Sequence, residues 1–370
     1  MEIERQVNFP KLFPRHARAA LLWIALAALL ASTSCGLMDR LAAAIEDSPG
    51  AESPASDAPL ITVYFTDPGA PGAASWSGGP DEALEAAINT AQESVDIAIY
   101  SFSLERIGEA LQRADRRGVA VRLVMERDNL ERSLPARLAR YGIPIVGDEG
   151  EGRMHNKFVV IDRQEVWTGS MNFTGSGTYQ DHNNLVQIRS ERVAENYTTE
   201  FEEMYLNRQF GAGSPANTPH PTVERLEVYF SPDDGVEKRL VELARSAKSS
   251  VAVMAFSLTS DAVTEALLER ASKGVRVRVV LDEEQAYSNT GGDYQTLKKA
   301  GIDVRLDGIP GQMHHKVLVV DGEWVVFGSY NFTRSAEVRN DENLILARDA
   351  ELAGLFLEEF ENIYRQAKAD

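Results

Sequence analysis

Short apolar runs alternate with amphipathic segments along the chain from residue 61 onward. Runs with apolar or alternating character predict strands at 61–65, 97–104, 118–124, 158–161, 226–230, 251–258, 274–280 and 317–320. Apolar residues spaced three and four apart predict helices at 81–91, 104–117, 193–206, 237–247, 260–273 and 350–367. Because strands alternate with helices, the pattern predicts a mixed α/β fold.

The pattern occurs twice. The run at 61–65 matches that at 226–230, 97–104 matches 251–258, and 118–124 matches 274–280. Each copy ends in a predicted helix. We therefore expect two α/β sandwich domains, packed with pseudo-twofold symmetry.

Two polar segments separate the expected parts. Residues 46–60 lack the apolar content to fold, and residues 211–221 are dense in Pro and Gly. The expected domains are a leader at 1–34, a tether at 35–60, a first domain at 61–210, a linker at 211–224 and a second domain at 225–370.

The N-terminal segment has the features of an export signal. Basic residues precede an apolar run of thirteen residues at 19–31, which is short for a bilayer span. Cys35, the only cysteine of the chain, follows this run and resembles the lipid acceptor of bacterial lipoproteins, although Ser32 departs from that motif. We expect export to a bacterial cell envelope with lipidation of Cys35; cleaved soluble export and a retained anchor are the alternatives.

The chain is acidic. Its 38 Lys and Arg against 56 Asp and Glu give a formal net charge of −18. Long-range attraction to a polyanion is therefore weak unless the site itself is basic. Nucleic acid is disfavoured as a partner on this ground, though not excluded.

One polar pattern is present in both copies at the same spacing. His155-Asn156-Lys157 precedes four apolar residues and Asp162, and the second copy repeats this from His314 through Lys316 to Asp321. In both copies a serine lies fifteen positions after the histidine and an asparagine seventeen. These residues are Ser170, Asn172, Ser329 and Asn331.

Strand geometry groups these side chains. Residues two apart share a strand face, so His155 and Lys157 point the same way, while Asp162 lies on the opposite face. A buried strand that starts with His and Lys incurs a desolvation cost, so these groups should meet a ligand or a partner. The aspartates are better suited to a structural or charge-tuning role than to direct attack.

The pattern resembles the phospholipase D superfamily, whose signature is HxKxxxxD followed by GSxN. The resemblance covers roughly residues 61–370 and implies one active site at the interface of the two domains. Both motifs lie in one chain, so we expect a monomer, and the reaction requires no metal or other cofactor. The acidic runs at 233–234 and 282–284 are expected to be loops and not metal ligands.

The resemblance also assigns roles. His155 would attack phosphorus to form a phosphohistidine, and His314 would act as acid and base. The catalytic set it implies is His155, Lys157, Asp162, His314, Lys316 and Asp321. The set on the substrate-binding side is Ser170, Asn172, Ser329, Asn331 and Glu342, with the lysines and asparagines on the phosphate oxygens and the serines in support.

The copies differ at one informative place. Eleven residues after Asn331 stands Glu342, where the family often has a carboxylate that holds a motif histidine; the first copy has Asn183 there. A carboxylate partner raises a histidine pKa, so we expect the two motif histidines to be unequal, in an order that the sequence leaves open. His182, His220 and His315 are expected to be ordinary structural residues.

Four functions compete for this chain. The leading one is phospholipase D-type hydrolysis or transfer of the phosphatidyl group of phospholipids, with a membrane near the expected lipid anchor. An endonuclease of the same superfamily and a cardiolipin synthase-type phosphatidyl transferase are the enzymatic alternatives. A binding module without turnover is disfavoured because both motifs are intact.

Overall fold

The computed structural model describes residues 61–212, 218–288 and 292–368. The expected leader, Cys35 and the tether lie outside the described residues, as does part of the expected linker, so these domain boundaries stay predictions. No helix in the described ranges is long and apolar enough to cross a membrane.

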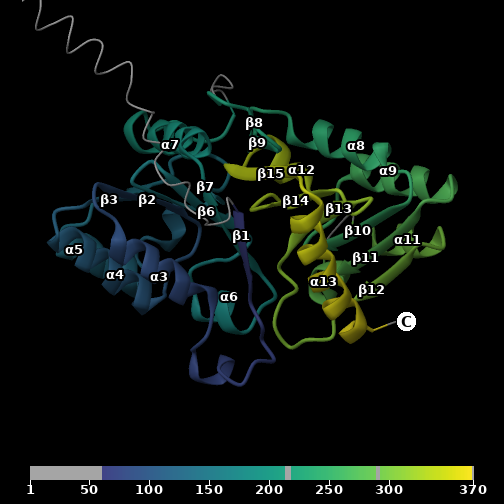
Figure 1. The fold of residues 1–370 in the computed structure, drawn as a ribbon, viewed down its shortest axis with the longest axis horizontal. Coiled ribbons are helices and arrows are strands. Elements are labelled where there is room, and N and C mark those ends of the chain that lie inside the picture. Colours follow the sequence, from purple (N-terminus) through teal and green to yellow (C-terminus); the bar gives the residue numbers. More distant parts are fainter. Residues whose placement is uncertain (1–60, 213–217, 289–291, 369–370) are drawn as a thin grey trace, which may run out of the picture. The chain divides into compact units, whose positions relative to one another are not determined.

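The first half is built on a seven-stranded sheet of order β1-β7-β6-β5-β2-β3-β4. Its strands are β1 (Ile61–Phe65), β2 (Ser94–Ile99), β3 (Ala120–Met125), β4 (Ile145–Gly147), β5 (Lys157–Ile161), β6 (Glu165–Gly169) and β7 (Asn184–Arg189). Its helices are η1 (Ala73–Ser75), α3 (Pro80–Thr90), α4 (Glu105–Arg116), η2 (Arg127–Asn129), α5 (Ser133–Tyr141), α6 (Gly175–Tyr179) and α7 (Glu191–Leu206). Figure 1 shows α3, α4 and α5 on one side of β2 and β3, and α7 on the other.

The second half repeats this plan on an eight-stranded sheet of order β12-β11-β10-β13-β14-β15-β9-β8. Its strands are β8 (Thr222–Val223), β9 (Leu226–Ser231), β10 (Ser250–Ala255), β11 (Arg276–Leu281), β12 (Asp303–Leu306), β13 (Lys316–Val320), β14 (Trp324–Gly328) and β15 (Glu342–Arg348). Its helices are α8 (Val236–Ser246), α9 (Asp261–Ser272), α10 (Glu283–Ser288), α11 (Tyr294–Lys299), α12 (Arg334–Val338) and α13 (Ala350–Gln366). The predicted mixed α/β class and the two related domains are confirmed.

The alignment of one repeated strand is corrected by the sheet register. Ile99 of β2 pairs with Lys157, and Ala255 of β10 pairs with Lys316. These two residues are therefore equivalent, and the match of 97–104 with 251–258 is two residues out of register. The shared Phe-Ser-Leu letters lie beyond the strand ends, where the same offset holds: Phe102 bridges Phe173, and Leu258, not Phe256, bridges the equivalent Phe332.

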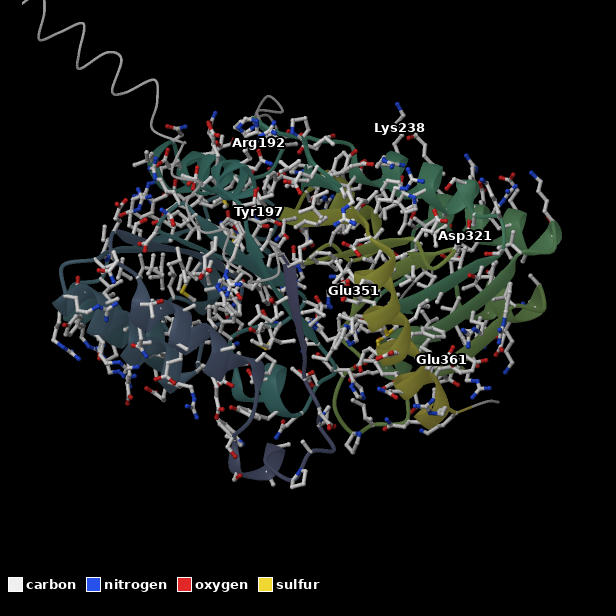
Figure 2. All side chains as sticks on the ribbon, in the orientation of Figure 1. Arg192, Tyr197, Lys238, Asp321, Glu351 and Glu361 are labelled. Carbon is white, nitrogen blue, oxygen red and sulfur yellow. The ribbon has the colours of Figure 1, made fainter. Side chains whose placement is uncertain are left out.

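The two halves share one hydrophobic core. Tyr197 of α7, labelled in Figure 2, packs edge-to-face on Phe230 of β9 at 5.0 Å between ring centroids. Phe356 of α13 packs in the same way on Phe65 of β1 at 5.1 Å. The last helix of each half thus packs against an early strand of the other half, α7 against β9 and α13 against β1. Such aromatic pairs stabilise by about 1 kcal/mol beyond their buried area.

Main-chain hydrogen bonds also join the halves next to the motif histidines. The amide of His155 donates to the carbonyl of Asp341 at 3.0 Å, and the amide of His314 donates to the carbonyl of His182 at 2.9 Å. Two glycines permit this approach. A Cβ on Gly152 would lie 1.8 Å from the carbonyl oxygen of Arg339, and a Cβ on Gly311 would lie 1.9 Å from that of Gln180.

We predict that Gly152→Ala and Gly311→Ala each separate the halves locally, because a backbone carbonyl cannot yield as a flexible side chain can. Each should cost about 1–3 kcal/mol of unfolding free energy, measured by denaturant titration. Gly354→Ala is the control, since a Cβ there has open space, and it should be neutral or slightly stabilising. Equal stability of all three variants would contradict the close contact.

Candidate functional site

Strands β5 and β13 place the two motif histidines at the contact between the halves. His155 and Lys157 come from the start of β5, and His314 and Lys316 from the start of β13. The two histidines are 8 % and 6 % exposed and both lysines 1 %. Each half thus contributes one histidine and one lysine to a buried cluster.

Each histidine is held by a side chain from the other half. The Nδ1 of His155 lies 2.7 Å from Oε2 of Glu342, and the Nδ1 of His314 lies 2.9 Å from Oδ1 of Asn183. With Nδ1 occupied, Nε2 is the nitrogen that each ring has left for a substrate. Glu342 and Asn183 thus hold different histidines: the carboxylate lies on His155 and the amide on His314. Which histidine is the nucleophile stays a prediction.

The lysines are anchored beside their histidines. Nζ of Lys157 donates to the carbonyl of His155 at 2.7 Å, and Nζ of Lys316 donates to that of His314 at 2.6 Å. An aromatic ring lies under each ammonium group: Tyr100 at 5.4 Å and Phe256 at 4.9 Å from Nζ to the ring centroid. Each ammonium keeps donors for a further acceptor, because it has three.

Burial opposes positive charge in this cluster. It lowers the pKa of His155 to about 4, against the opposing effect of Glu342, and lowers the pKa of Lys157 to about 7. Burial also lowers the pKa of His314, reinforced by the neighbouring lysine charges, and the pKa of Lys316, reinforced by Lys157. The four groups lie close enough for their charges to interact. A bound anion would favour their charged forms.

The two motif asparagines have free side chains. The Oδ1 atoms of Asn172 and Asn331 are buried, and neither has a hydrogen-bond partner within the described ranges. A buried acceptor without a partner is unfavourable. Because the oxygen and nitrogen of an amide exchange places when the side chain flips, either asparagine could turn its Nδ2 donor toward a phosphate oxygen.

The serines support the site from behind. Ser170 is fully buried and donates to Oδ1 of Asn183 at 2.8 Å, so it fixes the residue that holds His314. Ser329 is also fully buried and accepts from the amide of Asn343 at 3.0 Å. Both serines thus bond within the protein, which agrees with the supporting role expected of them, and Glu342 holds a motif histidine as expected.

The place of Asp162 and Asp321 in the catalytic set is corrected. They follow the far ends of β5 and β13, roughly 20 Å along the chain from the motif histidines. Asp162 accepts hydrogen bonds from the amides of residues 92–94, and Asp321, labelled in Figure 2, accepts from those of residues 248–250. Each carboxylate caps the entry into β2 or β10, a structural role that several charge-assisted hydrogen bonds explain.

Sequence reasoning missed a second polar layer. His315 lies on the opposite strand face, fully buried, with Nδ1 2.9 Å from Nδ2 of Asn184 and Nε2 3.4 Å from Oε1 of Glu359. His182 forms main-chain bonds on both sides of Met313: its amide donates to the carbonyl of Gln312, and its carbonyl accepts from the amide of His314. His220 lies apart, against Glu195. The one signal in the sequence for this layer is that His315 follows directly after His314.

No group of three or more His, Cys, Asp or Glu side chains in the described ranges is arranged to hold a metal ion. The acidic runs take other roles where they are described: Asp282 accepts from the amide of Met313, and Asp234 from the amide of Phe230.

Comparison with known proteins gives consistent results. A family model described as "Cardiolipin synthase, PLD-like domain" matches residues 84–205 and again 240–364. A phospholipase D of Rickettsia prowazekii is 37 % identical over 35 % of this chain and 62 % of that protein. A mitochondrial cardiolipin hydrolase of Chlamydomonas reinhardtii is 35 % identical over 35 % of this chain and 58 % of that protein.

The chain thus spans about three fifths of the length of these curated relatives. Among solved structures, a phosphatidylserine synthase of Haemophilus influenzae has the same fold at 14 % identity. Its TM-score is 0.61, covering 83 % of this chain and 87 % of that one. The family match covers more than half of the chain, and it includes both motif strands. The chain belongs to the phospholipase D superfamily, with two PLD-like domains in one chain.

Proposed function

We propose that this protein is a phosphodiesterase that hydrolyses or transfers the phosphatidyl group of phospholipids through a phosphohistidine. The observation that carries the proposal is the convergence of two histidines and two lysines in one buried cluster, with Nδ1 of each histidine already bonded. Such a cluster matches the needs of a phosphate diester: a nucleophile, a proton donor and cations for the non-bridging oxygens.

The reaction would proceed in two displacements. Nε2 of His155 attacks phosphorus, the bond from phosphorus to the leaving oxygen breaks, and His314 gives its Nε2 proton to that oxygen. Water or an alcohol then attacks phosphorus, His314 takes its proton, and the P–N bond to His155 breaks. Lys157, Lys316 and the two motif asparagines hold the non-bridging oxygens throughout.

The unequal partners support His155 as the nucleophile. Attack makes the imidazole of His155 a cation, and the Glu342 carboxylate at its Nδ1 stabilises that charge. The neutral Asn183 fixes the His314 ring without holding its proton as strongly, so His314 is the better acid. The carboxylate and the amide thus divide the two roles.

A lipid substrate is favoured over a nucleic acid. The formal net charge of −18 opposes approach of a polyanion from a distance, whereas a lipid with one phosphate needs only the local cluster. Relatives with names that refer to phospholipids agree with this choice. One chain supplies both motifs, so a monomer would suffice.

The direct test is turnover of phosphatidylcholine, cardiolipin and single-stranded DNA by purified protein. We predict hydrolysis or transfer on lipid, and a loss of about 10³-fold or more in His155→Ala and in His314→Ala, because both groups act in one sequence of steps. Thermal melts verify that the variants are folded. A variant that keeps about a tenth of the wild-type rate would refute the shared site, and cleavage of DNA alone would make the protein a nuclease.

The second test separates the roles of the two histidines by pH. Glu342→Gln removes the charge that raises the pKa of His155, so the acidic limb of kcat/KM should move to lower pH by about one unit. Asn183→Glu should raise the pKa of His314 and move the basic limb to higher pH. The profiles are measured from about pH 2.5 to 10, so that the acidic limb near the His155 pKa of about 4 and its shift both fall inside the range. Profiles that coincide with wild type, or a Glu342→Gln shift on the basic limb instead, would contradict the division of roles.

We also propose that lipidation at Cys35 holds the catalytic body at a membrane of the bacterial envelope. Cys35→Ser should then move the protein from the membrane fraction to the soluble fraction, or leave it unprocessed, since one lost acyl anchor removes the main source of membrane affinity. The catalytic rate of the isolated body, measured on detergent-dispersed lipid, is the control and should be unchanged. A Cys35→Ser protein that still incorporates labelled fatty acid would disprove the assignment.

A further inference from the structure

The two sides of the site differ in charge although the halves repeat. Two residues before His155 stands Arg153, and two residues before His314 stands Gln312. Both are bound alike through their main chains: the carbonyl of Arg153 accepts from the amide of Asp341 at 2.9 Å, and that of Gln312 from the amide of His182 at 2.8 Å. The backbone is therefore the same, and the side chain is what changes.

Arg153 shares an aromatic neighbour, Tyr100, with His155 and Lys157. Its guanidinium carbon is 6.0 Å from the centroid of the Tyr100 ring, and the His155 ring lies 4.9 Å from the same centroid. Nζ of Lys157 is 5.4 Å from it. The guanidinium, the imidazole and the ammonium group therefore all lie near the Tyr100 ring. In the other half Phe256 takes the place of Tyr100, with His314 and Lys316 near its ring.

A chain of hydrogen bonds links the backbone of Arg153 to the partner of His155. Its amide donates to Oδ1 of Asn340 at 3.3 Å, and Nδ2 of Asn340 donates to Oε1 of Glu342 at 3.3 Å. Glu342 in turn holds His155. The position of Arg153 is therefore coupled to the support of the expected nucleophile.

The guanidinium itself is exposed and unpaired. Within the described ranges no carboxylate lies at salt-bridge distance from it, although Glu149 and Glu151 are exposed on the same loop. Other guanidinium groups that flank the sheets are paired with carboxylates, as in Arg122 with Asp96 and Arg239 with Glu227. An unpaired arginine next to a site in an acidic protein is suited to a ligand.

We propose that Arg153 binds a second phosphate of the same substrate molecule, on the His155 side of the site. The inference rests on the proposed function and narrows its substrate class to phospholipids with a second phosphate near the scissile one. A guanidinium presents a planar fork that matches phosphate, and the bond is charge-assisted. A lipid with one phosphate and a neutral headgroup leaves Arg153 in water, and Gln312, at the equivalent position of the other half, carries no charge to bind a second phosphate.

The first experiment measures binding without turnover. Calorimetric titration compares propane-1,3-diol bisphosphate with propyl phosphate on wild type, Arg153→Gln, Arg153→Lys and the control Arg192→Gln. Arg192 is an exposed arginine on α7, labelled in Figure 2, beyond the end of β7 distant from Ser170. Arg153→Gln recreates the chemistry of position 312.

Wild type should bind the bisphosphate about tenfold more tightly than the monophosphate, and Arg153→Gln should lose this preference while its monophosphate affinity stays within about twofold. Arg153→Lys should keep part of the preference, and Arg192→Gln all of it. A wild type without the preference, or an Arg153→Gln protein that keeps it, would overturn the proposal.

The second experiment measures turnover on cardiolipin, phosphatidylcholine and an oligonucleotide. Arg153→Gln should raise KM for cardiolipin about tenfold, with kcat and the phosphatidylcholine rate within about twofold of wild type. An effect confined to the oligonucleotide would mean that the second phosphate belongs to a nucleic acid, which overturns the lipid assignment. Wild type that turns over none of the three would refute the proposed function, and the calorimetric preference would still decide the role of Arg153.

Discussion

Each motif histidine depends on the half of the molecule that does not contain it. The amide of His155 donates to the carbonyl of Asp341, and the His155 ring bonds Glu342. In the same way, the amide of His314 donates to the carbonyl of His182, and the His314 ring bonds Asn183. Two lysines and two histidines in one buried cluster repel one another when charged, and each loses hydration. Burial alone therefore disfavours the cluster. The four side chains stay together because the halves share a core with aromatic contacts across it. The main-chain bonds beside the histidines add to this. The site therefore exists only while the halves are packed.

The same constraint explains what an anionic substrate contributes. Burial lowers the pKa values of both motif lysines and both motif histidines. A phosphate diester would supply the negative charge that these groups lack, and the asparagine amides would supply neutral bonds. Substrate binding and activation of the acid are thus linked by electrostatics, and the acidic surface of the protein has little part in either.

Much of this could be predicted from the sequence because it rests on local pattern. The apolar period located the strands that carry the motifs, and alternation along β5 separated His155 and Lys157 from Asp162. The pairing of Glu342 with His155 could not be predicted, since 187 positions separate them and only the packing of the halves joins them. The layer behind the site was missed for the same reason: a lone His182 or His315 has no pattern that distinguishes it from a structural histidine. The match of 97–104 with 251–258 was wrong because it aligned the identical residues Phe-Ser-Leu that follow the two strands. The register of β2 and β10 is fixed instead by their pairing with β5 and β13, which the sequence does not show.

Repetition of one fold twice in a chain permits the two copies to diverge. A carboxylate at 342 and an amide at 183 give the two histidines different chemistry on the same backbone, and an arginine at 153 opposite a glutamine at 312 gives the two sides of the site different charge. These differences are what a division between nucleophile and acid would require.

Identification of the covalent intermediate tests most directly whether His155 is the nucleophile. In His314→Ala the first displacement can still occur with a substrate whose leaving group needs no proton, such as a nitrophenyl diester, while the second loses its base. Rapid quench and mass spectrometry of peptides under alkaline conditions should then find the phosphoryl adduct on His155, and none in His155→Ala. An adduct on the peptide that contains residue 314, or an adduct in His155→Ala, would contradict the assignment.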